Sequence, residues 1–312
     1  MRGRIISKMR VILILLSLFI SDLAFTHDRG VERINFFPDA ESWLIASYSH
    51  TRLEIETPEA TVKTKEVHNH YNLLTLAYAH RFSHKLFAGI KFGYEEASEN
   101  VATYGLPLRR RFTSTGFVNP ELFLNYRLRS QKKDRGNFDA HLAIVPTMGS
   151  RKISKTPMNR FSGRNSIRMH ASHGFLEEQW EFQNLVGATL NSEGPEENEF
   201  SRFNFTLESS YIIDYAFTTQ YAIQENLFLS GTIGIVYRLK EVLRQSTAGE
   251  REHRSGTGSL FRLGVKRKIS DWSLIDFGYS LHRSEYFIEA DTFNLNGDST
   301  SHKFQLNYVV LF

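Results

Sequence analysis

The chain of 312 residues contains no cysteine, and after its first 20 residues it has no long apolar run. The lack of cysteine excludes disulfide bonds, thiolate metal sites and a lipid-anchored cysteine. Without a run of about 20 apolar residues, no transmembrane helix is predicted in the remainder. An excess of one charge is also missing, because the formal net charge is +4 and most of it lies in residues 1–26. A nucleic-acid partner is therefore not indicated.

The N-terminus has the composition of a secretory signal peptide. Four basic residues precede an uncharged apolar run at residues 11–20, which is roughly half the length needed to span a bilayer. Ala24 suits cleavage after Thr26, so we predict a signal peptide at residues 1–26 and an exported mature chain. A retained membrane helix is the alternative interpretation.

Apolar side chains recur at every second position from residue 42 onward. Between Leu86 and Tyr94, for example, aliphatic and aromatic residues alternate with Phe87, glycines and Lys91. A polar, glycine-containing face opposite an apolar face is typical of a membrane barrel, whereas a soluble sandwich has an apolar buried side. A soluble secreted all-β protein is the alternative.

Twelve such segments are predicted, with short turns alternating with longer connections near 58–66, 99–115, 151–163, 192–204, 242–256 and 287–300. The fold class is therefore all-β, a transmembrane antiparallel up-and-down β-barrel of about 12 strands at residues 42–312. Residues 27–41 are expected to form a periplasmic segment that lies at the barrel mouth or plugs it. The predicted strands are 42–57, 67–82, 85–98, 116–129, 137–150, 164–176, 178–191, 205–223, 226–241, 257–269, 271–286 and 301–312.

The last segment resembles the terminal targeting strand of bacterial outer-membrane barrels, which the barrel assembly machinery recognises. The resemblance lies in a final aromatic residue and alternating apolar positions before it: Phe304, Leu306, Tyr308, Val310 and Phe312. Together with the signal peptide, it predicts the outer membrane of a Gram-negative bacterium, with its lipids, its lipopolysaccharide and the assembly machinery as partners.

Residues 115–150 resemble paired segments of the outer-membrane proteins of the MetA pathway of phenol degradation. The matching residues are Gly116, Asn119, Pro120, Glu121, Tyr126, Arg127, Pro146 and Thr147, whereas Met148 departs from the pattern by separating Thr147 from Gly149. The resemblance implies a barrel that moves small, often hydrophobic compounds.

Charged residues of both signs fall at positions predicted to face the lumen. They are expected either to set the selectivity of a narrow water path or to pair with one another across the lumen. The lumen-lining candidates are Lys91, Glu95, Glu121, Arg127, Asp139, Arg168, Asp214, Arg238, Arg262, Lys266 and Asp276.

The predicted function is a narrow channel or transporter for small molecules, some of them hydrophobic. The alternative is a non-conducting structural barrel, or one that binds partners through its outer loops, and an outer-membrane lipid hydrolase comes third. The hydrolase rests on the His-x-Ser pairs His170/Ser172, His253/Ser255 and His282/Ser284, which lack the Asn that follows the Ser in such enzymes.

No catalytic residue, metal site or cofactor is predicted, because these pairs are common in a chain with 12 histidines and a solvated rim explains His68 and His70. The cluster of Arg109, Arg110 and Arg111 is a candidate for contacts with lipopolysaccharide phosphates, and a loop without a partner is the alternative.

Overall fold

The computed structural model describes residues 40–57, 65–102, 109–129, 136–153, 160–198, 205–245, 251–290 and 293–312. Every regular element in these ranges is a β-strand. No helix within these ranges is long and apolar enough to cross a membrane. The signal peptide at residues 1–26, and all but the last two residues of the segment 27–41, lie outside the described residues.

The described ranges contain 16 strands, which are numbered in chain order. They are β1 (Ser42–Thr57), β2 (Lys65–Ser83), β3 (Leu86–Ala102), β4 (Arg109–Phe117), β5 (Glu121–Arg129), β6 (Asn137–Val145), β7 (Arg151–Ile153), β8 (Ser166–Glu177), β9 (Trp180–Asn191), β10 (Gly194–Asn198), β11 (Phe205–Leu207), β12 (Ser210–Gln224), β13 (Leu227–Gln245), β14 (Arg251–Ser270), β15 (Ser273–Ala290) and β16 (Phe293–Leu311).

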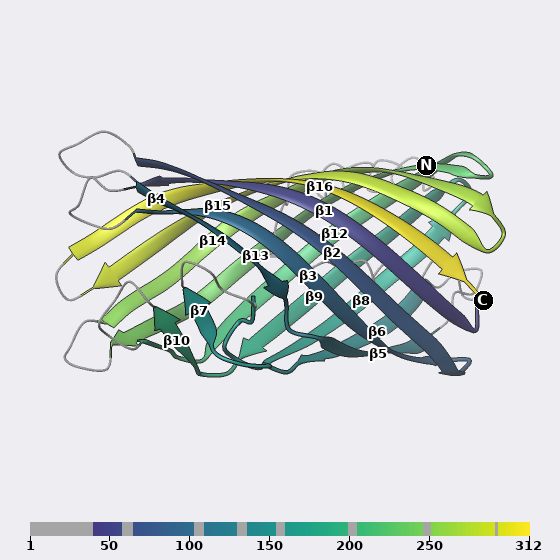
Figure 1. Ribbon diagram of the computed structural model, residues 1–312. Helices are drawn as coiled ribbons and strands as arrows, with labels where there is room; N and C mark the ends of the chain where they lie inside the picture. The colour runs from purple at the N-terminus through teal and green to yellow at the C-terminus, as the bar shows by residue number, and fades with distance from the viewer. Residues whose placement is uncertain are drawn as a thin grey trace, which may run out of the picture.

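These strands form one sheet that closes on itself (Figure 1). β1 pairs with both β2 and β16, and β12 pairs with both β9 and β13. Four wall strands are interrupted, namely β4/β5, β6/β7, β9/β10 and β11/β12, so the 16 strands build a wall of 16 − 4 = 12. The predicted antiparallel barrel is confirmed.

The two ends of the barrel differ. Short turns at residues 84–85, 178–179, 225–226 and 271–272 lie at the end that also holds the C-terminus, on the right of Figure 1. We call this the periplasmic end and the opposite one the outer end, because short periplasmic turns are the rule in outer-membrane barrels.

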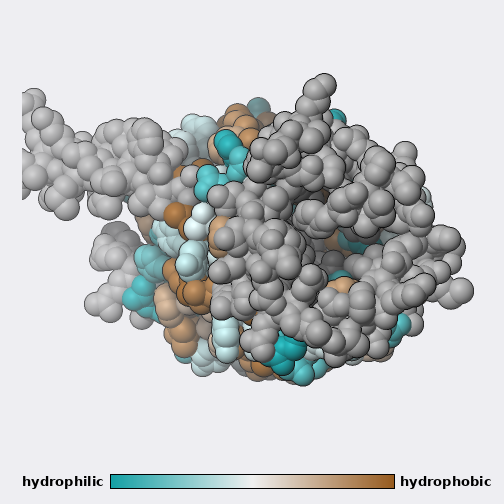
Figure 2. Space-filling model, turned by 90° about the vertical axis from the view of Figure 1, so that its left-hand side faces the viewer, coloured by the Kyte–Doolittle hydropathy of each residue, from teal (hydrophilic) through white to brown (hydrophobic). Residues whose placement is uncertain are grey.

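Large apolar side chains cover the outside of the wall. On β2, for instance, Leu74 is 57% exposed, whereas its neighbours Thr75 and Ala77 are buried on the inner face. Figure 2 shows such apolar residues along the outside of the barrel. Because large apolar side chains gain by leaving water, this exposed surface indicates contact with hydrocarbon.

Exposed aromatic residues gather toward both ends of this apolar surface. Phe82, Trp180, Trp272 and Phe312 lie beside the periplasmic turns. Tyr94, Phe117, Tyr211 and Tyr237 lie toward the outer end. Two aromatic girdles of this kind mark the two interfaces of the bilayer.

The strands extend beyond the predicted spans on the outer side. β4 includes residues 109–115, which were predicted as part of a loop, and the β15–β16 hairpin continues to the pair Ala290 and Phe293, within the predicted loop 287–300. Beyond the hydrocarbon both faces of a strand meet water, so the alternation of apolar residues is lost while the hydrogen-bond ladder continues. The predicted strand 116–129 is wrong in being continuous, because it breaks at residues 118–120, where Pro120 has no backbone N–H to donate.

Closure predicts resistance to detergent. A barrel without a free edge in the membrane has no place where unfolding can begin cheaply. The purified protein should therefore migrate differently on a detergent gel before and after boiling. An identical migration, together with a soluble periplasmic location in cell fractionation, would discard the membrane barrel.

The C-terminal residue closes the seam between β1 and β16. The backbone N–H groups of Glu41 and Ser42 donate to the Phe312 carbonyl at 3.0 and 3.1 Å, and the Phe312 N–H donates to the Ser42 carbonyl at 2.9 Å. Deleting Phe312 removes these bonds as well as the ring, so we expect less folded protein in the outer membrane by heat-modified gel analysis. Phe312→Ala keeps the backbone and removes only the ring. An unchanged folded amount in the alanine variant would remove the role assigned to the aromatic ring.

Candidate functional site in the barrel lumen

All eleven predicted lumen-lining residues lie at inward positions of the wall. Six of them are buried, namely Lys91, Glu121, Asp139, Asp214, Lys266 and Asp276, and the other five are half-buried. The structure brings most of them together in ion pairs. Their role in selectivity stays a prediction.

Glu121 on β5 is the centre of one group. Its Oε2 accepts from Arg168 Nη1 at 2.7 Å and lies 3.5 Å from Lys91 Nζ, so cations from β8 and β3 meet on one carboxylate. The strand between β5 and β8 is β6, whose Ala143 lies opposite Arg168. This small side chain leaves room for the guanidinium to reach past it.

His170 on β8 reaches across β9 in the same manner. Its Nε2 lies 3.5 Å from Oδ1 of Asp214 on β12, and the intervening position on β9 is Gly187. A Cβ at Gly187 would collide with both side chains. The glycine is therefore required by the pair that lies over it.

Arg262 on β14 repeats the arrangement over Gly278 of β15. Its guanidinium lies 3.7 Å from Asp276 Oδ2 and donates to Gln305 Oε1 at 3.3 Å. A Cβ at Gly278 would meet this guanidinium. Lys266 lies on the same strand, four residues nearer the periplasmic end, and its Nζ donates to Gln220 Oε1 at 2.8 Å.

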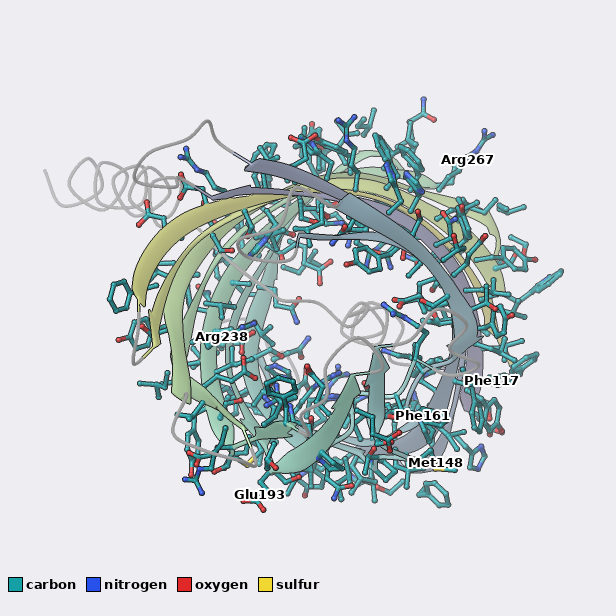
Figure 3. All side chains as sticks on the ribbon, turned by 60° about the vertical axis from the view of Figure 1, so that its left-hand side comes forward. Phe117, Met148, Phe161, Glu193, Arg238 and Arg267 are labelled. Carbon is teal, nitrogen blue, oxygen red and sulfur yellow. The ribbon has the colours of Figure 1, made fainter. Side chains whose placement is uncertain are left out.

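Three of these contacts share one geometry. The side chains of Arg168, His170 and Arg262 extend sideways along the wall, over a small residue of the neighbouring strand (Ala143, Gly187 and Gly278), to a partner on the strand beyond it (Glu121, Asp214 and Gln305). Figure 3 shows side chains on both faces of the wall, with Arg238 pointing inward and Arg267 outward. The inner charges thus form a belt along the wall.

An apolar cluster lies inside the barrel toward its periplasmic end. Trp43 is fully buried and stacks on Phe123 with a centroid separation of 5.7 Å, and the ring of His141 follows at 6.1 Å from Phe123. The other members are Ile45, Ala77, Ala79, Ala143, Leu274 and Val309. The predicted inward face was polar, so the sequence interpretation missed this cluster. Adjacent apolar residues at positions 43–46, which break the alternation, were the available signal.

Residues 160–165 form an irregular segment on the inner side of the wall, which we call the strap. At its start, the Arg160 N–H donates to the carbonyl of Phe117 on β4 at 2.9 Å. The Arg160 side chain pairs with Glu95 on β3 at 2.8 Å. The predicted loop 151–163 therefore folds inward in its last part, which alternation alone could not show.

The far end of the strap is held on the opposite side of the barrel. Arg164 Nη2 pairs with Glu241 on β13 at 2.5 Å, and Arg238 Nη1 contacts the other oxygen of the same carboxylate at 3.3 Å. Gly163, with a φ of 77°, lets the chain turn closely against Gly194. Two ion pairs, to β3 and β13, thus hold the strap in place.

The strap covers an interruption of the wall. Among the described strands, β4 pairs only with β3 and β7 pairs only with β10, so no ladder joins β4 to β7. Figure 3 places Phe161 of the strap nearer the barrel axis than Phe117 and Met148, which are 60% and 61% exposed. Phe117 packs edge-to-face on Tyr94 of the outer girdle, so the interruption begins where water replaces hydrocarbon.

The remaining sequence candidates do not form a site in the described residues. His170 and Ser172, like His282 and Ser284, lie on the inner face and not toward lipid. The side chains of His68, His253, Arg109, Arg110 and Arg111 lie outside the described part of the chain. No group of three or more metal-ligating side chains occurs in that part.

No family model and no curated protein sequence matches the chain, but solved structures do. The COG4313 outer membrane channel from Pseudomonas putida F1 matches with a TM-score of 0.63 and 13% identity, over 88% of this chain and 96% of that chain. The transport unit of the autotransporter AIDA-I from Escherichia coli matches with a TM-score of 0.53 and 9% identity, over 95% and 96%. The translocator domain of the autotransporter NalP from Neisseria meningitidis gives 0.50 and 13%, over 91% and 94%.

At these identities the matches show the fold. The chain has the fold of the outer-membrane β-barrels that it matches, and the barrel predicted from the sequence is confirmed at this level.

The close packing of the inner wall yields a stability prediction. A Cβ at Gly89 would collide with the Phe123 ring and with the backbone oxygen of Tyr78, and the backbone cannot move aside cheaply. Gly89→Ala should therefore destabilise the barrel by about 1–3 kcal/mol, the usual cost of overpacking. The measurement is the temperature at which the folded band disappears on a detergent gel.

Gly231→Ala is the matched control, because its Cβ would meet only Thr219 at 3.9 Å. This control should be neutral or slightly stabilising, since alanine restricts the unfolded chain. Equal effects of the two substitutions would contradict the packing argument.

Proposed function

We propose that the protein is a narrow, passive channel for small molecules across the outer membrane. The observation that carries this proposal is the charged belt of the lumen, in which charges of both signs lie along the wall of a closed barrel. A barrel interior that holds charge is typical of a path that contains water. The Pseudomonas putida F1 neighbour is an outer membrane channel, which supports the same class of function.

The outer end supplies an entrance in this proposal. Figure 2 views that end of the barrel, and hydrophilic as well as hydrophobic residues of the described wall are visible inside it. Charges that line a narrow path between low-dielectric walls focus the electric field, so they select strongly among ions. The strap, with Arg160 and Arg164, lies on this path and would narrow it.

A closed structural barrel is the second candidate. The apolar cluster around Trp43 and Phe123 favours it, because packed rings inside the periplasmic half obstruct water. In that case the inner ion pairs serve stability alone. The inward position of His170 and Ser172 gives no support to a lipid hydrolase, so neither candidate includes a catalytic step.

Neighbouring residues of β14 provide the test. Lys266 is buried on the inner face, whereas Arg267 is exposed on the outer face (Figure 3). Replacing both Arg262 and Lys266 with Gln removes two inner positive charges, each worth about 1 kcal/mol to an ion at 4 Å in water. Reversal potentials in a planar bilayer should then shift toward cations, by roughly fivefold in the permeability ratio for each charge.

The control Arg267→Gln removes a positive charge one residue away on the lipid side, and it should leave the permeability ratio unchanged. Absence of conductance in the wild-type barrel, combined with a loss of heat resistance in the double variant, would establish the closed barrel in place of the channel. Conductance that both variants leave unaltered would show that the belt does not line the path.

A further inference from the structure

A row of basic and imidazole side chains crosses the outer face of the wall. Arg52 on β1 lies directly opposite His70 on β2 and directly opposite His302 on β16. All three belong to the outward series of their strands, because the alternate inward positions Ser49, Asn69 and Lys303 are buried. Adjacent strands are about 4.8 Å apart, so the three side chains stand side by side.

The row lies at the border of the apolar surface that is nearer the outer end of the barrel. The next outward residues toward the periplasmic end are His50, Asn72 and Phe304, followed by Tyr48, Leu74 and Leu306. The His302 ring is held by a hydrogen bond of 2.8 Å between its Nδ1 and the Tyr279 hydroxyl, and the His50 and His70 rings stack at 5.8 Å. The row is therefore positioned where the acyl chains of the outer leaflet end and the head groups begin.

Carboxylates also occur near the row. Glu54 pairs with Nη2 of Arg52 at 2.8 Å, and Glu96 accepts from Asn72 at 3.4 Å. Arg52 nevertheless keeps half of its side-chain surface exposed, and a guanidinium has five N–H donors. Arg283, on the far side of β16, adds a second exposed guanidinium, which contacts Asp298 at 3.4 Å.

We propose that this row is a binding site for a phosphate group of lipopolysaccharide in the outer leaflet. A guanidinium binds phosphate through paired N–H donors, and flanking imidazole N–H groups add donors on both sides. The apolar and aromatic residues below the row contact the acyl chains of the same lipid. The proposed site lies on the outside of the barrel, on the face formed by β15, β16, β1 and β2. Lipid binding there does not depend on the lumen or on conduction.

Native mass spectrometry of the folded barrel in detergent tests the site. The probes are bis-phosphorylated lipid A and the same lipid with both phosphates removed. The wild-type barrel should bind the phosphorylated form more tightly, and Arg52→Gln should weaken that binding about fivefold, the worth of one arginine near an anionic surface. Arg267→Gln, an exposed arginine at the periplasmic end, is the matched control and should bind like wild type.

Three outcomes would overturn the proposal: equal affinity of the wild-type barrel for both lipids, equal effects of Arg52→Gln and Arg267→Gln, or displacement of lipid A by inorganic phosphate at equal concentration. The last would identify a free-phosphate site in place of a lipid site. Migration of the unboiled variants on a detergent gel confirms that each remains folded, so a loss of binding reports the site and not the fold.

Discussion

The structure depends on the inability of hydrocarbon to form hydrogen bonds. Every backbone N–H and C=O within the membrane needs a partner in the protein, and strands satisfy this only when the sheet closes. The seam between β1 and β16, completed by Phe312, meets that requirement. The same requirement explains the position of the interruption between β4 and β7, which begins at the outer girdle, where water can serve as the partner.

The closed wall faces lipid on one side and holds charges on much of the other. On the charged part of the inner face, long side chains lie over small ones. Arg262 lies over Gly278 and contacts Asp276 and Gln305, and His170 lies over Gly187 and contacts Asp214, so these polar side chains meet their partners along the wall. The cluster around Trp43 is the part where side chains pack against one another instead.

The alternation of residue types in the sequence predicted those features of the strands that arise because one face meets lipid and the other faces the lumen. The strands and the inward positions of residues such as Lys91 and Asp276 followed from alternation, because lipid and lumen select opposite residue types on successive positions. Alternation could not reveal β4 at residues 109–115, where water lies on both faces. It also missed the strap, since Arg160 and Arg164 act through contacts with β3 and β13 that are distant in sequence.

Successive residues of a strand point to opposite faces of the wall. The face on which a residue lies therefore matters more than its closeness in sequence to other residues when roles are assigned in this barrel. Lys266 and Arg267 are adjacent in sequence, yet one belongs to the lumen and the other to the membrane surface. Arg52 and the buried Ser49 are likewise separated by the wall. Under the two proposals made above, a cation on the inner face acts on a solute in a narrow lumen, whereas a cation on the outer face acts on lipid head groups at the border of the apolar surface. The pleat of the strand thus decides which of these two surroundings a given cation meets.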